Sequence, residues 1–297
     1  MRERRALVRT VLALTALLGG CGVSVIAGAP MMIRIRVPAG VRRVSIPGTT
    51  SGFRARAAYV YIPPGTHVGD HLPVLELLHG VPGGPADWIV RGRLRAALDE
   101  FAAAHHGHAP IVVLPDINGA RRVDTECVRA PDGGDVEQYL TVDVPRWVAT
   151  NLPATSDRRH WAIAGLSEGG TCSTMLALRH YRQYRAFADL SGLARPTVGD
   201  RDDPQRTVQV LFDGSVRAYH QHDPLWLLRR HRYAGLSAWF GCGRLDRAVR
   251  ADQDSVSDAA RKAGIAAYDE VVAGGHTWQV WRTELHKLLP WLWAIIR

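Results

Sequence analysis

Lysine is nearly absent from this chain of 297 residues. It occurs only at Lys262 and Lys287, so 35 of the 37 basic residues are arginine, and with 28 acidic residues the formal net charge is +9. A balance this basic could indicate a nucleic-acid-binding protein. The arginines, however, are scattered among apolar positions, and neither zinc-finger spacing nor an RNP-like aromatic motif accompanies them. We therefore expect no nucleic-acid partner.

Other absences narrow the class of protein further. The body of the chain holds no apolar run long enough to cross a bilayer, which excludes a polytopic membrane protein. Hydrophobic residues make up 46% and charged residues 22%, which excludes a disordered, collagenous or coiled-coil protein. No C-x-x-C motif and no Cys/His cluster occurs, so no zinc site is indicated. A globular protein remains.

The first segment has the layout of a secretory signal peptide. A basic start, with arginine at positions 2, 4, 5 and 9, precedes a short apolar run over residues 11–18. The following Leu18-Gly19-Gly20-Cys21 resembles the lipobox of bacterial lipoproteins, whereas Ala27-Gly28-Ala29 fits the small-x-small cleavage rule. We predict a signal peptide or a lipoprotein signal over residues 1–29, with Cys21 lipidated in the second case. An uncleaved anchor helix is the alternative.

Export would leave the protein secreted or anchored to the cell envelope. Residues 30–43 are then expected to form a short basic tether, because Pro30, Pro38 and Gly40 argue against regular structure. The positive charge of the chain would favour peripheral association with an anionic envelope. An oxidising compartment also permits one disulfide among the remaining cysteines, which are Cys127, Cys172 and Cys242.

Residues 44–297 alternate between strand-like and helix-like segments. Short apolar runs typical of strands in a parallel sheet occupy residues 57–62, 72–78, 111–114, 161–164, 186–190, 236–240 and 267–272. Helical periodicity occupies about 92–104, 142–150, 168–183, 251–263 and 278–296. This alternation predicts one α/β domain with a mostly parallel, doubly wound sheet and helices on both faces.

A Gly-x-Ser-x-Gly motif joins the strand at 161–164 to the helix at 168–183. It comprises Gly165-Leu166-Ser167-Glu168-Gly169. In a nucleophile elbow this motif makes a sharp turn that lifts the serine hydroxyl above the sheet edge. Ser167 is therefore the candidate nucleophile. A Gly-rich turn of a nucleotide fold is the alternative, and it fits less well because no G-x-G-x-x-G occurs.

A serine needs a base to become nucleophilic at neutral pH. In the α/β-hydrolase order the histidine comes last, after the final strand, and His276 occupies that place in Gly274-Gly275-His276. The third member should follow the strand at 236–240, where Asp246 ends a Gly-rich turn. Asp252 and Asp254 are rival acids, although they also suit the N-terminal residues of the next helix.

An oxyanion hole requires two backbone N–H groups. One should come from Glu168, the residue after the nucleophile, and one from the loop after the strand at 72–78. That loop contains His79-Gly80-Val81-Pro82. Because Pro82 has no N–H, Val81 is the better donor. A plain Gly/Pro turn is the alternative.

These motifs together resemble the esterase D family of α/β-hydrolases, which includes S-formylglutathione hydrolases, feruloyl esterases and secreted mycolyltransferases. The resemblance rests on Leu-Leu-His-Gly at 77–80, Gly-Leu-Ser-Glu-Gly-Gly at 165–170 and Gly-Gly-His-Thr-Trp at 274–278. It covers residues 44–297 and implies a Ser-His-acid triad with neither metal nor cofactor. Mycolyltransferases use a glutamate as the acid, so Asp246 resembles the plain esterases.

The chain also resembles exported members of this family in Asp124-Thr125-Glu126-Cys127 and Gly170-Thr171-Cys172. This resemblance implies a Cys127–Cys172 disulfide that braces the rim of the site, with two free buried thiols as the alternative. Cys242 is expected to be buried and unpaired.

The loops at 84–95, 115–140 and 193–235 are expected to set the shape of the pocket. The second of them contains a group of polar residues that could bind a polar acyl acceptor such as a sugar, or could simply form turns. These are Asp116, Asn118, Asp124 and Glu137.

The sequence as a whole predicts an exported serine esterase that is monomeric and cleaves a small-molecule or lipid ester through an acyl-enzyme on Ser167. Acyl transfer to a sugar or another alcohol is one alternative. A non-catalytic binding protein on a hydrolase scaffold is the other.

Overall fold

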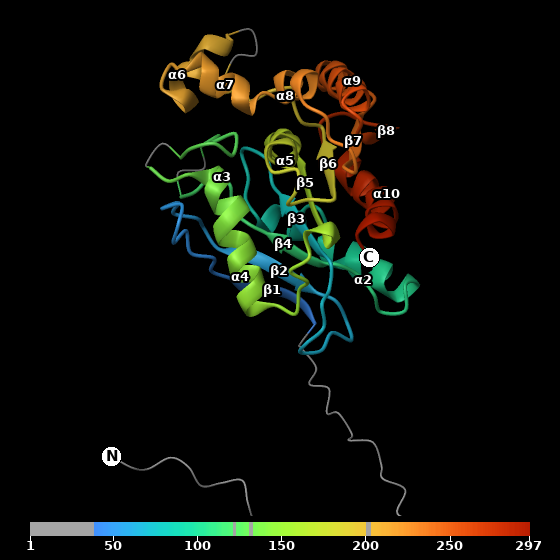
Figure 1. Cartoon of the computed structure of the whole chain (residues 1–297). Helices are drawn as coiled ribbons and strands as arrows, with labels where there is room; N and C mark the ends of the chain where they lie inside the picture. Colours follow the sequence, from blue (N-terminus) through green and yellow to red (C-terminus); the bar gives the residue numbers. More distant parts are fainter. Residues whose placement is uncertain (1–38, 121–122, 131–132, 200–202) are drawn as a thin grey trace, which may run out of the picture. The chain divides into compact units, whose positions relative to one another are not determined.

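A computed structural model describes residues 39–120, 123–130, 133–199 and 203–297 (Figure 1). Within them a single sheet of eight strands forms the centre of the domain. The strands are β1 (Gly40–Val44), β2 (Ala58–Ile62), β3 (Val74–Leu78), β4 (Ile111–Leu114), β5 (Trp161–Leu166), β6 (Ala186–Leu190), β7 (Ser237–Gly243) and β8 (Ala266–Val272).

The helices alternate with these strands. They are α1 (Ala86–Val90), α2 (Leu94–Ala104), α3 (Val136–Gln138), α4 (Val144–Asn151), α5 (Glu168–Arg179), α6 (Pro204–Phe212), α7 (Val216–His222), α8 (Pro224–Arg230), α9 (Arg247–Lys262) and α10 (Trp278–Ile296). A π-helical segment η1 (Tyr139–Asp143) joins α3 to α4, and a 3-10 turn η2 (Arg158–His160) precedes β5.

The sheet is parallel except at one edge. Its strand order is β1-β2-β4-β3-β5-β6-β7-β8, and the antiparallel pairs are β1 with β2 and β2 with β4. All the other neighbours run parallel. The carboxyl ends of β3, β5, β7 and β8 therefore lie at the same end of the strands, where α/β proteins place their ligands. The predicted α/β-hydrolase fold is confirmed.

Two apolar cores cover the two faces of the sheet, and β5 shows how one strand serves both. Trp161 and Ile163 pack in the core shared with α4, α5, α8 and α9. Ala162, Ala164 and Leu166 pack in the core shared with α1, α2 and α10. Successive side chains of a strand point to opposite faces, so a strand buried on both faces is apolar at most of its positions. This is why β5 could be predicted as a continuous apolar run.

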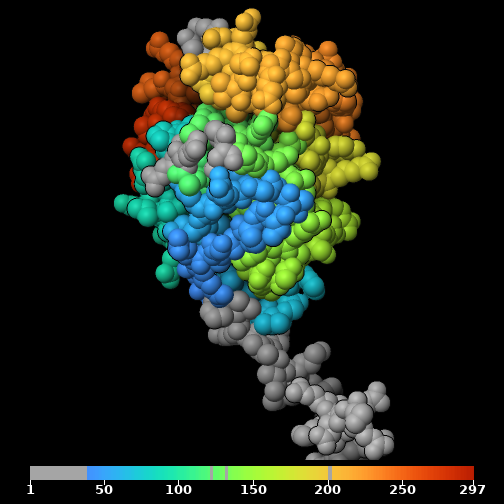
Figure 2. Space-filling model, turned by 90° about the vertical axis from the view of Figure 1, so that its left-hand side faces the viewer, coloured from blue at the N-terminus to red at the C-terminus, as the bar shows by residue number. Residues whose placement is uncertain are grey.

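Two predictions about irregular segments are wrong. The predicted tether at residues 30–43 ends in regular structure, since Gly40–Val44 forms β1 and pairs with Ala58–Ile62. The predicted loop at 193–235 contains α6, α7 and α8, which lie at one end of the domain, orange in Figures 1 and 2. The predicted signal segment at residues 1–29, with Cys21, lies outside the described residues and stays a prediction. Across the part of the chain that the structure covers, no helix is long and apolar enough to cross a membrane.

A buried carboxyl group lies between α10 and β7. Glu284 of α10 has no exposed surface, and its two carboxyl oxygens lie against the backbone of Gly241, with no hydrogen-bond partner among the described residues. Burial, followed by the nearby carboxylates of Asp189 and Glu270, raises the pKa of Glu284 to about 9. The folded chain therefore carries this side chain as the neutral acid at neutral pH.

Glu284→Gln is expected to change how stability depends on pH. Above about pH 4.5 the unfolded chain releases the Glu284 proton, while the folded chain keeps it up to about pH 9. Folding thus takes up a proton in this window, and the contribution of Glu284 to the free energy of unfolding falls as the pH rises. Because glutamine cannot ionise in either state, the stability of the variant relative to the wild type should increase by about 1.4 kcal/mol per pH unit.

Urea unfolding of both proteins at pH 5, 6, 7 and 8 measures this difference. Glu100→Gln is the matched control, because Glu100 is exposed on α2 and the same substitution there removes a carboxyl group that the core does not enclose. A pH-independent difference for Glu284→Gln would show that Glu284 is ionised in the folded chain.

Candidate active site

Ser167 lies on a strained turn between β5 and α5. Its backbone angles are φ 56° and ψ −123°, a combination that a residue with a side chain rarely adopts. The turn is held closed because its flanking positions leave no room for a side chain: a Cβ atom on Gly165 would lie 2.2 Å from the carbonyl oxygen of Gly169. The Ser167 N–H donates to the carbonyl of Leu190 at 2.9 Å. The serine thus stands at the N-terminus of α5, whose dipole favours negative charge there.

The structure brings the three predicted side chains together. His276, in the loop between β8 and α10, accepts a hydrogen bond at Nε2 from the Ser167 hydroxyl at 3.0 Å. Its Nδ1–H donates to Oδ2 of Asp246, after β7, at 2.6 Å. The side chain of Asp246 is 13% exposed and that of His276 is 40% exposed. This geometry lets His276 take a proton from Ser167 while Asp246 holds the required tautomer.

The rival acids lie elsewhere. Asp252 and Asp254 are in the second turn of α9, which begins directly after Asp246. The sequence suggested that both acids are among the first residues of this helix, but they lie one turn further along it. The acid bonded to His276 is Asp246.

Trp281 packs against the ring of His276, a contact that the sequence did not predict. The Trp281 indole meets the His276 ring edge to face, with centroids 5.0 Å apart. Its Nε1–H donates to the hydroxyl of Ser191 at 3.2 Å. The helical periodicity of residues 278–296 did not indicate this contact, because packing against a loop histidine leaves no local signal in the sequence.

The loop after β3 is held from several sides. The Arg56 guanidinium donates to the carbonyl of Gly83 at 3.0 Å and forms an ion pair with buried Asp116. The Gly84 N–H donates to Asp87 at 2.9 Å. Val81 joins Pro82 through a cis peptide bond, and both residues line the cavity above Ser167. Sequence analysis also missed Arg56, which lies far from this loop in the chain.

His79 supports the same loop through both ring nitrogens. Its Nδ1 lies 3.0 Å from the carbonyl oxygen of Gly80, and its Nε2 lies 3.2 Å from a carboxyl oxygen of Asp116 and 3.2 Å from the backbone nitrogen of Ile117. Asp116 stays ionised beside it, because hydrogen bonds from His79 and Arg56, together with the Arg56 charge, hold the pKa of Asp116 well below its usual range despite its burial.

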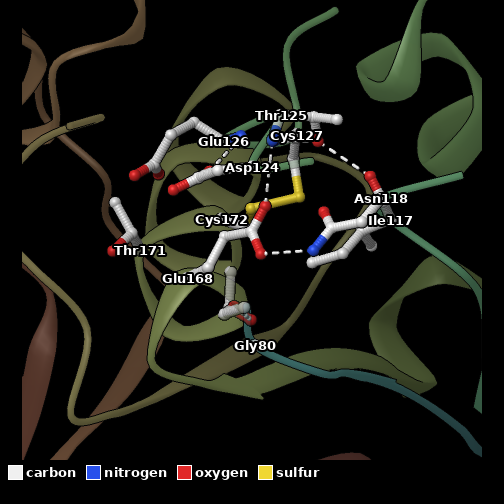
Figure 3. Close-up of a disulfide and its surroundings, with 12 residues drawn as sticks. Gly80, Ile117, Asn118, Asp124, Thr125, Glu126, Cys127, Glu168, Thr171 and Cys172 are labelled. Carbon is white, nitrogen blue, oxygen red and sulfur yellow. Dashed lines mark hydrogen bonds between the residues drawn. A yellow bond between two sulfur atoms is a disulfide. The ribbon is translucent and has the colours of Figure 1, made fainter. Parts of the chain in front are cut away.

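A disulfide ties the elbow helix to the loop after β4. Cys127 and Cys172 are bonded, with their Cα atoms 5.7 Å apart, as the resemblance implied (Figure 3). Cys242 is a free buried cysteine, and burial raises the pKa of its thiol to about 12. The disulfide brings residues 117–118 and 124–127 against the first turn of α5 (Figure 3).

The Glu168 side chain turns away from the cavity and into this buried contact. One carboxyl oxygen accepts from the Asn118 amide at 2.8 Å and the other from the Thr125 N–H at 3.2 Å (Figure 3). Burial, with the neighbouring Asp124 and Glu126, raises the pKa of Glu168 well above its usual value. The side chain therefore anchors the residue whose backbone N–H was predicted to bind an oxyanion.

A cavity of about 520 Å³ opens above Ser167 and His276. It is bounded by the loop after β3, by α1 and by the start of α10. Its other lining residues are Gly80, Val81, Pro82, Gly83, Asp87, Arg91, Leu166, Thr277, Trp278, Gln279 and Trp281. Of the three segments expected to shape the pocket, only 84–95 does so; among the described residues, 115–140 and 193–235 do not line it.

The polar residues at 115–140 hold the fold together instead of lining this cavity. Asp116 pairs with Arg56, and Asn118 with Glu168. The Asp124 carboxylate accepts from the Glu126 N–H at 3.0 Å. Glu137 accepts hydrogen bonds from Arg179, His180 and His222, which tie α3 to the end of α5 and to α7. A sugar site built from these four residues is therefore not present at the cavity.

No group of three or more metal-ligating side chains is found across the described ranges. The site consists of a serine, a histidine and an aspartate in hydrogen-bonded series beneath a cavity.

The family with which this chain aligns is described as "putative esterase", and the match covers residues 52–292. The chain belongs to this family. An uncharacterized protein of Corynebacterium glutamicum is 37% identical over 252 residues, which are 82% of this chain and 58% of that protein. The diacylglycerol acyltransferase/mycolyltransferase Ag85B of Mycobacterium leprae is 25% identical over 183 residues, or 52% of this chain and 55% of that protein. The chain thus spans somewhat more than half the length of these curated relatives.

Solved esterase structures share the fold. A ferulic acid esterase superimposes with a TM-score of 0.72 at 22% identity, covering 86% of this chain and 99% of the esterase. At this identity the likeness concerns the fold alone. With the esterase family match and the mycolyltransferase relative, it confirms the resemblance to the esterase D group.

Proposed function

We propose that this member of the esterase family is a serine esterase that works through an acyl-enzyme. The observation that carries the proposal is the hydrogen-bonded series from Ser167 through His276 to Asp246 on a strained strand-to-helix turn. A free serine hydroxyl is a weak nucleophile, and an oriented neutral imidazole is the group that activates it.

Each residue of the series has a defined part in the reaction. The Ser167 oxygen attacks the ester carbonyl as its proton passes to Nε2 of His276, while Asp246 stabilises the resulting imidazolium. The tetrahedral oxyanion is bound by the backbone N–H groups of Val81 and Glu168, near the positive end of the α5 dipole. His276 then protonates the leaving alcohol, so the carbon–oxygen bond breaks and an acyl-Ser167 ester remains.

Water completes the cycle. His276 removes a proton from a water molecule, the resulting hydroxide attacks the acyl-Ser167 carbonyl, and the acid product leaves as the proton returns to Ser167. Asp246 forms no bond to the acyl group at any step. We propose that the protein acts outside the cytoplasm, which the disulfide between Cys127 and Cys172 supports.

The test is labelling with a fluorophosphonate probe, which reacts with an activated serine. The wild-type protein should be labelled, with the phosphonyl group found by mass spectrometry on the peptide that contains Ser167. Turnover of neutral p-nitrophenyl esters of increasing acyl length should accompany the labelling. A protein that neither labels nor turns over these esters would instead be a binding protein on a hydrolase scaffold.

Acyl transfer is the second candidate, because one relative is named an acyltransferase. The two reactions share the acyl-enzyme and differ only in whether water or an alcohol attacks it. Product analysis with a carbohydrate acceptor present separates them, since transfer yields the acylated sugar and hydrolysis yields the free acid.

A further inference from the structure

Arg91 is a cation at the mouth of the cavity. It follows the last residue of α1, is exposed and lines the cavity that holds Ser167 and His276. Within the described ranges no carboxylate forms an ion pair with it, and its guanidinium carbon instead lies 5.3 Å from the centroid of the Trp278 ring. A guanidinium over an indole keeps its N–H groups free at its edge for another acceptor.

The position of Arg91 is fixed through contacts that lead to the histidine. Trp278 packs edge to face on Trp88 and on Trp281, at centroid distances of 5.4 Å and 5.3 Å. Trp281 in turn contacts His276. The Arg282 guanidinium donates to the backbone carbonyl of Arg91 at 3.2 Å, which holds the end of α1. The charge therefore stands at a defined place relative to the reacting groups.

The nearest acidic group on the same helix is directed elsewhere. Asp87 also lines the cavity and lies one turn before Arg91, but one of its carboxyl oxygens accepts from the Gly84 N–H. Its carboxylate thus serves the loop after β3. Arg91 remains the group in this cavity that offers several donors and a positive charge to a ligand.

We propose that Arg91 selects esters that carry a negative charge a few bonds from the scissile carbonyl. This inference rests on the proposed esterase function and narrows its substrate class. The charge belongs either to the acyl group or to the alcohol, since Arg91 borders the cavity that must hold both. The guanidinium presents a planar fork of donors, and a carboxylate matches that fork with two parallel hydrogen bonds.

The experiment compares charged esters with their neutral amide isosteres. For the acyl side, the p-nitrophenyl half-esters of glutaric and adipic acid are paired with the corresponding p-nitrophenyl esters of the monoamides. For the alcohol side, 4-acetoxybenzoate is paired with 4-acetoxybenzamide. At low salt the wild type should favour the charged member of at least one pair by about ten-fold in kcat/KM, mostly through KM. The preference should shrink at 0.5 M salt, because the site is exposed.

Arg91→Gln should reduce the charged-to-neutral ratio to about one, and Arg91→Lys should retain part of it, because lysine keeps the charge without the fork. Arg93→Gln is the matched control, since Arg93 is exposed on the same segment and does not line the cavity. It should keep the wild-type ratio. Thermal melting of each variant shows that it is folded.

A wild-type ratio near one for all the pairs, or a ratio that survives in Arg91→Gln, would overturn the inference and leave the esterase function standing. Absence of turnover for every ester, charged or neutral, would remove the esterase function and the inference with it.

Discussion

Ser167→Ala is expected to lower kcat/KM for p-nitrophenyl esters by at least about 10⁴-fold and to abolish fluorophosphonate labelling. The substitution removes the oxygen that donates to His276 and would form the acyl bond. It leaves the elbow in place, because the turn is set by the backbone contact with Leu190 and by the close approach of Gly165 to Gly169. The loss should therefore appear without a matching loss of stability.

Ser255→Ala is the matched control for this prediction. Ser255 is exposed on α9, and its hydroxyl donates only to the Ala251 carbonyl of the same helix. The control should keep the wild-type rate and labelling. Retention of more than about one hundredth of the wild-type kcat/KM by Ser167→Ala would assign the nucleophile to another group.

Asp246→Asn is expected to lower kcat by about 10³–10⁴-fold. The asparagine amide can donate to Nδ1 of His276, and the tautomer that accepts this bond carries its proton on Nε2. That tautomer cannot accept the Ser167 proton. The neutral amide also removes the charge that stabilises the imidazolium. The change is nearly isosteric, so melting temperature and KM should move little while kcat falls.

The two rival acids supply the controls for this second variant. Asp252→Asn and Asp254→Asn change carboxyl groups in the second turn of α9, past the residue bonded to His276. Both should stay within a few-fold of the wild-type kcat. If either variant loses more activity than Asp246→Asn, the acid has been assigned to the wrong side chain.

The parts of the fold that could be predicted are those with a local signature. Strands β4 and β6 were predicted at their observed bounds, because each is a short, mostly apolar run that is buried on both faces. Strand β1 was missed because it is only partly buried, and its Arg42 and Arg43 resemble a basic linker. An edge strand owes its conformation to the partner with which it pairs.

Helices α6 and α8 were missed although each begins with an Asp-Pro signal. Asp203 and Asp223 accept hydrogen bonds from the N–H groups of the first turn, and Pro204 and Pro224 occupy the first helical position. These start signals were available in the sequence. The helices have only nine and seven residues, however, and helices this short are marginal until they pack on the domain.

The residues of the site also fall into those that the sequence could predict and those that it could not. Ser167, His276 and Asp246 follow strands in a known order, so their meeting could be predicted from the motif that surrounds each one. Arg56 and Trp281 support the same site through contacts between segments far apart in the sequence. Such contacts belong to the tertiary structure, and a single sequence carries no record of them.

The direction of β1 determines at which end of the strands the described chain enters the sheet. Gly40 pairs with Ile62, and Tyr59 pairs with Leu114. The chain therefore enters the sheet at the end of the strands opposite to the carboxyl ends of β3, β5, β7 and β8. The cavity is at those carboxyl ends. The entry of the chain into the sheet and the cavity therefore lie at opposite ends of the strands.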